Sequence, residues 1–519
     1  MKLFRRLLLP LLLPLCSFAQ QVPFQLEIEP VTATAVPPIH SFAFAQSGSK
    51  WLIVGGRTNG LHGFSTNDNF ALEYANSYIV VVDTVTWNYY TSSVLDLPMN
   101  VKDPLRATNM QYTVKGDYLY MVGGFGWDSI LNRYETYSTL TAIHIDSMIN
   151  AVVNGLPIAP HIRQVTNTNL QVCGGEMITI GDTSYLVFGH YFRGRYSETP
   201  GPSFVQAYVN EIRKFEIQDD GVNLTLNYHG AISDTNNFHR RDLNVSPAID
   251  PAGNEMWTAF SGVFRKDNDL PYLSPITYKP SSGYAVDGTF EQRLNNYSCP
   301  SIPIFDSVHG TMYTVLMGGC SMYDYNPQNG NQTLDSLVPF VADMSVMVQS
   351  ATGQWSQVPL QLQFPGLLGS NMKFVPVDTI PMYGNDVIRL RDVQGRILIG
   401  YLYGGIEASG PNDQPSIAND TIFRVYLTPD LNLLNAQEHT SLISTVFPNP
   451  VSDQLIVNVQ NAGTTTVELR NALGQIVFSQ KQQGIGTVII PVQKLAAGNY
   501  TVTLKSETDA VAFPVTISH

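Results

Sequence analysis

One short pattern recurs along this chain: a stretch of apolar residues with high strand propensity that ends in a pair of glycines. Four clear copies end at residues 55–56, 123–124, 318–319 and 404–405, and two degenerate copies end at Gly189 with His190 and at Ser261 with Gly262. Six copies at spacings of roughly 55 to 90 residues indicate a repeat architecture. In such an architecture no single unit can bury its apolar faces alone, so the units must pack on one another.

Charge and composition restrict the partners of such a chain. The formal net charge is -13 over 519 residues, which argues against nucleic acid or an anionic membrane as the main partner. Charged residues make up only 14% of the chain while aromatic residues make up 11%, a balance typical of an extracellular all-β protein. We expect a monomer.

The first 19 residues are predicted to be a signal peptide. A basic start at Lys2, Arg5 and Arg6 precedes an apolar stretch at residues 7–15. A transmembrane helix needs about 20 apolar residues, so this stretch is too short, and no later stretch is long enough. We expect cleavage between Ala19 and Gln20. The alternative is a lipoprotein anchored through Cys16, which has a poor lipobox match.

Each unit is predicted to contain four antiparallel strands. In the first unit these are residues 41–45, 51–56, 78–83 and 87–90; the glycine pair closes the second strand and Trp87 opens the fourth. The fifth unit repeats this order, with Trp355 opening its fourth strand. The pattern resembles the kelch repeat, and the resemblance implies an all-β, six-bladed kelch-type β-propeller over residues 20–436. Units three and four depart from it, since both lack the glycine pair and the tryptophan.

A ring of sheets must close on itself. Residues 24–29 alternate apolar and polar side chains and precede the first unit, so we expect them to form the outer strand of the sixth sheet. The alternative is that residues 431–436 take that position.

After a linker at residues 437–444, the tail at residues 445–519 changes character. Seven short alternating strands with frequent turn signals predict a small Ig-like β-sandwich. Three landmarks occur in order: Pro448-Asn449-Pro450, Gly474-Gln475, and Gly498 two residues before Tyr500. The tail resembles the type A C-terminal sorting domain of the type IX secretion system. This resemblance implies a Gram-negative bacterium, export with the translocon and sortase as partners, and release or anchoring at the outer-membrane surface. Many relatives carry a lysine near the last strand, but here the nearest is Lys505.

Polar and aromatic residues gather in the loops after each second strand and before each first strand, which share one face of the predicted ring. The candidate ligand-binding residues there are His40, Arg57, Arg106, Trp127, Asp128, His190, Arg193, His239, Arg240, Arg241, Asp242, Tyr297 and Tyr323. Arginine pairs with carboxylate or sulfate groups and aromatic rings stack on sugar faces, so the set favours a carbohydrate or an anionic ligand. The alternative is a solvated loop surface, with residues 239–242 forming a buried salt-bridge network in which Asp242 partners one arginine.

Three cysteines remain after the signal segment. Cys299 and Cys320 are predicted to lie at the same end of adjacent strands and to form a disulfide, with two reduced thiols as the alternative. Cys173 is expected late in the first strand of unit three, buried and free.

The function predicted from these observations is a secreted or cell-surface module that binds a carbohydrate or an extracellular protein. The alternatives are a carbohydrate-active enzyme (an epimerase, lyase or hydrolase) on the same face, and an adhesive surface protein. Phosphate-loop, nucleophile-elbow and zinc-protease motifs are absent from the sequence. We expect no cofactor; calcium in the loops at residues 67–69 and 324–331 is the minor alternative.

Overall fold

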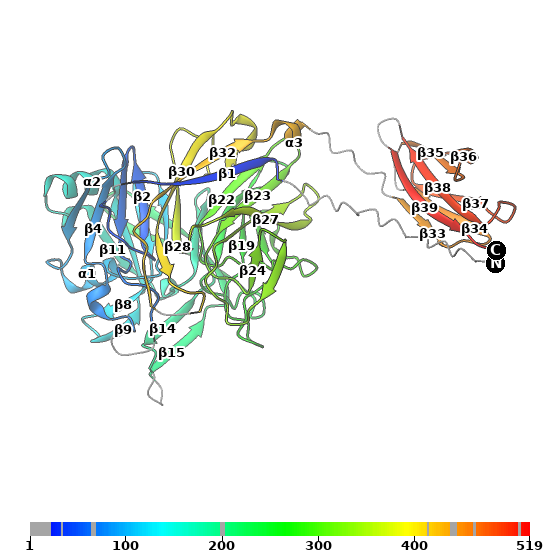
Figure 1. Cartoon of the computed structure of the whole chain (residues 1–519). Coiled ribbons are helices and arrows are strands. Elements are labelled where there is room, and N and C mark those ends of the chain that lie inside the picture. The colour runs from blue at the N-terminus through cyan, green and yellow to red at the C-terminus, as the bar shows by residue number, and fades with distance from the viewer. Residues whose placement is uncertain are drawn as a thin grey trace, which may run out of the picture. The chain divides into compact units, whose positions relative to one another are not determined.

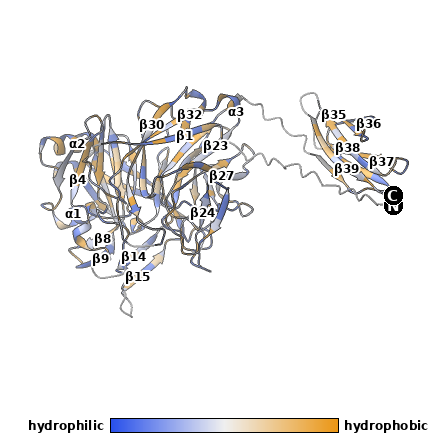
Figure 2. Ribbon diagram, viewed as in Figure 1, coloured by the Kyte–Doolittle hydropathy of each residue, from blue (hydrophilic) through white to orange (hydrophobic). Residues whose placement is uncertain are grey.

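The computed structural model describes residues 22–32, 35–63, 69–197, 203–412, 415–435, 444–459, 463–506 and 510–519. The chain divides into two compact units, Met1–Asp430 and Leu431–His519 (Figure 1). The predicted signal peptide with its cleavage point at Ala19, and residues 437–443 of the predicted linker, lie outside the described residues. Hydrophobic segments follow the strands of both units (Figure 2).

Six antiparallel sheets build the first unit. The first three sheets contain β2 (Ala43–Ser47), β3 (Lys50–Val54), β4 (Tyr78–Asp83) and β5 (Tyr89–Ser93); β6 (Gln111–Lys115), β7 (Tyr118–Val122), β10 (Thr139–His144) and β11 (Ile162–Thr166); and β12 (Glu176–Ile180), β13 (Thr183–Val187), β16 (Glu211–Asp219) and β17 (Leu224–Ser233). The next two contain β18 (Asn244–Ile249), β19 (Glu255–Phe260), β20 (Ile276–Lys279) and β21 (Gly283–Val286); and β22 (Ser301–Asp306), β23 (Thr311–Met317), β26 (Asp343–Gln349) and β27 (Trp355–Gln363), with β29 (Ile388–Arg389) parallel to β22. The sixth contains β28 (Leu367–Pro376), β30 (Ile397–Ala408), β32 (Phe423–Pro429) and β1 (Phe24–Pro30), with β31 (Ser416–Ala418) beside β30.

Short elements fill the connections between these strands. The hairpins are β8 (Phe125–Asp128) with β9 (Arg133–Thr136), β14 (His190–Gly194) with β15 (Phe204–Tyr208), and β24 (Tyr323–Asn326) with β25 (Asn331–Leu334). The helices are α1 (Met99–Leu105), α2 (Ile145–Asn154) and α3 (Leu431–Asn435), and the 3-10 turns are η1 (Leu72–Tyr74), η2 (Ala159–His161), η3 (Thr168–Leu170) and η4 (Leu390–Asp392).

In each of the six sheets of the first unit the second strand carries a pair of residues with a left-handed backbone: the pair follows the strand in five sheets and lies within β30 in the sixth. The first of the two has φ between 51° and 72°, and the second has φ between 81° and 91°. In the third sheet the pair is Phe188 with Gly189, one residue earlier than the sequence suggested, and in the fourth it is Ser261 with Gly262. Glycine suits the first position because a Cβ at Gly123 would lie 2.1 Å from the carbonyl oxygen of Val172. The degenerate copies therefore keep the conformation of the repeat without both glycines.

The second residue of the pair bonds its sheet to the next one. Five such N–H groups donate to carbonyls that precede the following first strand: Gly56 to Ala107 (2.8 Å), Gly124 to Val172 (2.9 Å), Gly189 to Arg240 (2.9 Å), Gly319 to Leu368 (3.0 Å) and Gly405 to Ile39 (2.9 Å). Ile39 precedes β2, so the last of these bonds joins the sixth sheet to the first. Each first strand also contacts that of the next sheet along the series β2, β6, β12, β18, β22 and β28. These six strands line one cavity of about 540 Å³, the axial cavity.

The N-terminal strand belongs to the last sheet, as the sequence predicted. β1 pairs antiparallel with β32 over its whole length, with Phe24 opposite Pro429 and Pro30 opposite Phe423. Phe24 is buried and meets Tyr313 edge to face, with ring centroids 5.5 Å apart. Residues 431–435 form α3 instead of a strand, so the alternative closing strand is wrong.

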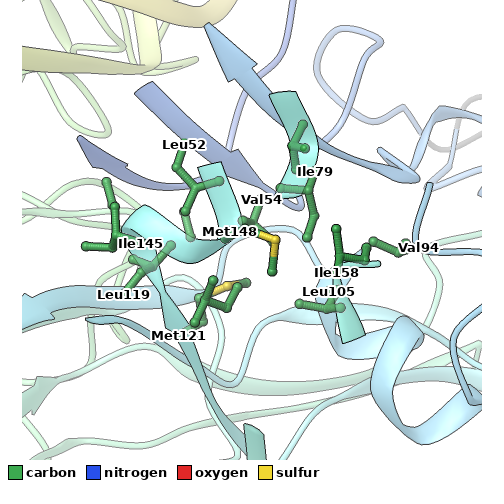
Figure 3. Close-up of a cluster of buried hydrophobic side chains, with 14 of the residues drawn as sticks. Leu52, Val54, Ile79, Val94, Leu105, Leu119, Met121, Ile145, Met148 and Ile158 are labelled. Carbon is green, nitrogen blue, oxygen red and sulfur yellow. The ribbon is translucent and has the colours of Figure 1, made fainter. Parts of the chain in front are cut away.

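Helix α2 between β10 and β11 was not predicted. Its buried residues recur at helical spacing, and the ring of His144 accepts a hydrogen bond from the N–H of Ser147 at its start. Met148 and Ile149 pack with Leu52 and Ile79 of the first sheet (Figure 3). Full burial of such a side chain contributes about 1.5–3 kcal/mol, so the helix ties the first two sheets together.

The second unit contains seven strands within the described residues, as expected. β33 (Ser444–Phe447), β34 (Gln454–Val459) and β37 (Gly486–Pro491) form one sheet, and β36 (Ile476–Gln483), β35 (Thr464–Arg470), β38 (Gly498–Lys505) and β39 (Ala510–Ile517) form the other. Both sheets contribute to one core of valine, leucine and isoleucine side chains. Alternation along β34 buries Leu455, Val457 and Val459, which is the pattern of a half-buried strand.

Candidate functional site

Six left-handed residues surround the axis on the face where the second strands end, here called the glycine-pair face. Five of them, Ser41, Asn109, Gly174, Asp242 and Ser298, precede the first strands of their sheets, and the sixth, Asn371, lies within β28. Backbone N–H groups bond neighbours in this ring: Asn109 donates to Ser41 (3.2 Å), Gly174 to Asn109 (3.0 Å), Asp242 to Gly174 (2.7 Å) and Asn371 to Ser298 (2.5 Å). A polar hollow of about 50 Å³ lies within the ring.

Arg241 and Asp242 form an ion pair at this ring. Nε of Arg241 lies 3.3 Å from Oδ2 of Asp242, and their side chains are 13% and 31% exposed. Burial works to lower the pKa of Arg241, but the Asp242 carboxylate, together with Tyr208, Tyr196 and Cys173, outweighs it, so the pKa of Arg241 is raised. Burial raises the pKa of Asp242, and Arg241 partly offsets this. The guanidinium is therefore a fixed, poorly solvated positive charge, and the predicted pairing of Asp242 with one arginine is confirmed.

His190 supports Arg241 from β14. Nη1 of Arg241 lies 3.3 Å from Nδ1 of His190, and Nε2 of Gln206 lies 2.6 Å from the same atom. Both neighbours are donors, so Nδ1 accepts and the ring proton belongs on Nε2. Burial, and then the charge of Arg241, hold the pKa of His190 well below its ordinary value.

Aromatic rings flank the arginine. Its guanidinium carbon lies 5.7 Å from the centroid of Tyr208 and 5.2 Å from that of Phe264. His239 stacks on Tyr208, with ring centroids 3.7 Å apart, and Nδ1 of His239 lies 3.0 Å from Oδ1 of Asn210. Cation–π contacts of this kind restrict the arginine to one orientation.

A second group on this face contains His40, Arg57 and His62. His40 and Arg57 exchange backbone hydrogen bonds of 3.0 Å, and Arg57 donates to the carbonyl of Ala71. His62 stacks on Phe70, with centroids 4.5 Å apart. Burial, followed by nearby arginine charge, lowers the pKa of His40 to about 3 and outweighs its backbone hydrogen bonds; burial lowers that of His62 to about 4. These histidines are neutral near pH 7, and the positive charge belongs to the arginines.

Arg240 is enclosed inside the protein and bonded to backbone carbonyls. Its side chain is fully buried, donates to the carbonyls of Asn237, Ser261 and Ser274, and lies 4.2 Å from the ring centroid of Tyr272. Burial lowers its pKa to about 9. Arg240 does not reach the surface, so its prediction as a ligand-binding residue is wrong.

The remaining predicted residues are spread over separate elements. Arg106 donates to the carbonyl of Leu72, Asp128 accepts two backbone N–H bonds in the turn after β8, and Trp127 meets Tyr134 edge to face. Arg193 lies on β14 and Tyr323 on β24. Tyr297 is close enough to Asp242 and Arg241 for their charges to affect its pKa, which burial raises well above its ordinary value. Of the six, Tyr297 alone is placed with the Arg241 group by an interaction among the described residues.

The cysteines differ from their predicted arrangement. Cys173, Cys299 and Cys320 are buried free thiols, so the predicted disulfide is wrong. The bridge partner of Cys320 is Tyr297, which leaves Cys299 two residues out of register. Residues in such a diagonal pair lie roughly 7–8 Å apart, whereas a disulfide needs Cα atoms within about 7 Å. Cys173 precedes β12 because Gly174 interrupts the extended chain with φ 63°.

Two charged side chains and a tyrosine in the axial cavity were not anticipated from the sequence. Glu176, Tyr112 and Lys373 all line this cavity. On the sequence they are ordinary strand residues, and the only signal was a charge within an otherwise apolar strand. Among the described residues no group of three histidine, cysteine or acidic side chains could hold a metal ion. No helix within the described part of the chain has the length and hydropathy to cross a membrane.

Comparison with known proteins identifies the second unit. Residues 445–516 match the family model described as the secretion system C-terminal sorting domain. This unit is a type IX secretion sorting domain, so the chain is exported to the cell surface or the medium and engages the type IX machinery. No curated protein matches the chain. The solved structure titled "Structure of YjhT" has 10% sequence identity and a TM-score of 0.41, covering 76% of this chain and 98% of that one. A likeness this weak does not establish a shared fold.

Proposed function

We propose that residues 22–430 form a closed six-bladed kelch-type β-propeller that binds an extracellular ligand. Three observations support the closed ring: six sheets of repeated topology, the bond from Gly405 to Ile39 between the last sheet and the first, and β1 in the last sheet. Radial packing of this kind leaves only short sheet edges exposed. Fold alone does not define the ligand.

The ligand proposed for the glycine-pair face is a carbohydrate, or a protein, that presents a carboxylate or sulfate. The observation that carries this proposal is the Arg241 guanidinium, which is held by Asp242, His190 and Tyr208 beside the axis. A preorganised arginine pairs its parallel N–H groups with two oxygens of a carboxylate or a sulfate with little loss of side-chain entropy. The histidines around the arginine are neutral, so they offer N–H donors and add no positive charge of their own.

Binding of the chain from residue 20 to an array of neutral, acidic and sulfated glycans tests the proposal. Arg241→Gln should lose binding to the acidic members, because a hydrogen bond to a charged group contributes about 1.5–3 kcal/mol. Arg396→Gln is the matched control, since its side chain is 40% exposed, pairs with Glu27 and Glu29, and precedes β30, at the end of that strand away from its glycine pair. Binding confined to neutral glycans, or acidic binding that Arg241→Gln retains, would exclude this site.

A further inference from the structure

The axial cavity contains two opposite charges at equivalent positions of different sheets. Glu176 follows the left-handed Gly174 by two residues on β12, and Lys373 follows Asn371 by two residues on β28. β12 begins the third sheet and β28 the sixth. In a ring of six the third and sixth members are opposite, so the two side chains approach the axis from opposite sides in one layer.

Contacts across the cavity support this placement. Nζ of Lys373 lies 5.2 Å from the ring centroid of Tyr112, although Tyr112 is on β6 in the second sheet. The first sheet separates the sixth sheet from the second, so Lys373 reaches across the cavity instead of toward an adjacent strand. Tyr112 and Glu176 are also close enough for the carboxylate to raise the pKa of the tyrosine, after the larger effect of burial.

Glu176 and Lys373 interact electrostatically without forming a contact pair. No salt bridge joins them within the described residues, and no described side chain hydrogen-bonds the Glu176 carboxylate. Burial raises the pKa of Glu176 more than Lys373 lowers it, so its charge is incompletely compensated. Burial works to lower the pKa of Lys373, but Tyr112 and Glu176 raise it overall. Two half-buried charges that do not touch forgo most of their mutual attraction.

The volume of the axial cavity and the residues that line it suit a small molecule. Ligand pockets are usually about 300–1,000 Å³, and this cavity measures about 540 Å³. The other titratable groups facing it are Cys299, Asp378 and Asp386. Burial raises the pKa of Cys299 to about 12, so its thiol is uncharged. Both aspartates are exposed, and Asp378 lies 3.2 Å from Nε2 of Gln46. Tyr112, Met177 and Phe374 add apolar surface. The interior charges therefore remain one ammonium and one carboxylate.

We propose that the axial cavity is a second ligand site, which binds a small zwitterion with its carboxylate on Lys373 and its ammonium on Glu176. A molecule with both charges would bridge the two side chains and recover the attraction that their separation forgoes. Tyr112 would hold Lys373 toward the ligand. Glu176 and Lys373 also line the polar hollow of the glycine-pair face, so the two sites adjoin. The zwitterion site does not use Arg241 and requires no ligand on it, so either proposal can fail without the other.

A length series of ω-amino acids tests the site. Glycine, β-alanine, 4-aminobutyrate, 5-aminopentanoate and 6-aminohexanoate are titrated into the chain from residue 20 by ligand-observed NMR, each beside the carboxylic acid and the amine of the same length. One member is expected to bind at least about tenfold tighter than both singly charged analogues, because it gains a charged hydrogen bond that each analogue lacks. If no zwitterion exceeds its analogues, the proposal is wrong.

Variants assign the two ends of the ligand. Lys373→Met should abolish the preference over the amine, and Glu176→Gln the preference over the carboxylic acid. The exchange Glu176→Lys with Lys373→Glu should restore zwitterion binding, since the ligand can turn around. Lys115→Met is the control because Lys115 pairs with the exposed Asp182 at 2.8 Å and does not line the cavity. Unchanged selectivity in folded single variants overturns the proposal; if they do not fold, the wild-type length series decides.

Discussion

Protonation of His40 should destabilise the first unit in mild acid. His40 is 5% exposed, its Nδ1 lies 3.0 Å from the hydroxyl oxygen of Ser41, and the charge of Arg57 is nearby. Burial first, and Arg57 second, lower its pKa from 6.5 to about 3. The unfolded chain therefore binds a proton at this side chain well above the pH at which the folded chain does.

The pKa difference sets the magnitude and its sign. Between pH 6.5 and pH 3 the unfolded state binds more protons than the folded state, so the free energy of unfolding falls as the pH falls through this range. One pKa unit corresponds to about 1.36 kcal/mol. His40 should thus remove about 2 kcal/mol of stability between pH 7.5 and pH 5.0. The other buried histidines add to the same trend, so a variant is needed to isolate His40.

The assay is guanidinium unfolding at both pH values, followed by tryptophan fluorescence. All five tryptophans lie in the first unit, so the signal does not include the sorting domain. His40→Asn keeps a short polar side chain near Ser41 and removes the titration. We expect its loss of stability between pH 7.5 and pH 5.0 to be about 2 kcal/mol smaller than that of the wild type.

His229→Asn is the control, since His229 is an exposed histidine on β17 whose only ion pair, with Glu216 at 3.1 Å, is a surface contact that contributes little to stability. It should keep the wild-type pH dependence. Equal losses for the wild type and His40→Asn would mean that His40 is not held neutral in the folded protein. The argument from its burial beside Arg57 would then be refuted.

Three further predictions follow from the repeat, the thiols and the sorting domain. Ser261→Gly should stabilise the first unit by about 1 kcal/mol in the same unfolding assay, because Ser261 has φ 51° and a buried hydroxyl with no hydrogen-bond partner among the described residues. Gly318→Ser should destabilise it by more than about 2 kcal/mol, because the added Cβ would lie 2.1 Å from the carbonyl oxygen of Leu368. Equal effects of the two variants on stability would contradict the comparison. The cysteines, whose pKa values burial raises to about 12, should react with a thiol reagent only after unfolding, and all three should then titrate in the chain from residue 20 without reductant; fewer would reveal a disulfide. Deletion of residues 445–519 should stop the protein from reaching the cell surface or medium, measured by fractionation and immunoblotting, and normal export would contradict the role of the sorting domain.

Much of the local structure could be predicted because it depends on neighbouring residues. The alternating pattern of residues 24–29 identified β1, and the turn signals of the tail identified its seven strands. Helix α2 was missed even though Ile145, Met148 and Ile149 have helical spacing, because the repeat placed a strand connection there. The glycine pair was located one residue late in the third sheet, since Phe188 adopts a backbone conformation that glycine usually marks.

The candidate site was predictable as a face but less so as a set of contacts. The pairing of Arg241 with Asp242 followed from their adjacency and from the cost of an unpaired buried charge. Arg240 could not be told from Arg241 by sequence, since consecutive residues point to opposite sides and only packing decides which side is buried. The pairing of Cys320 with Tyr297, and not with Cys299, likewise depends on strand register.

The sequence by itself determined the all-β class, the repeated strand and glycine pattern, and the sorting domain, because each is written in residues close together along the chain. Only the tertiary structure decided which charges meet. Glu176, Tyr112 and Lys373 are far apart in sequence and share the axial cavity because their strands begin three different sheets. Whether a charge faces solvent, a partner or a cavity depends on packing between sheets, and no local pattern encodes that arrangement.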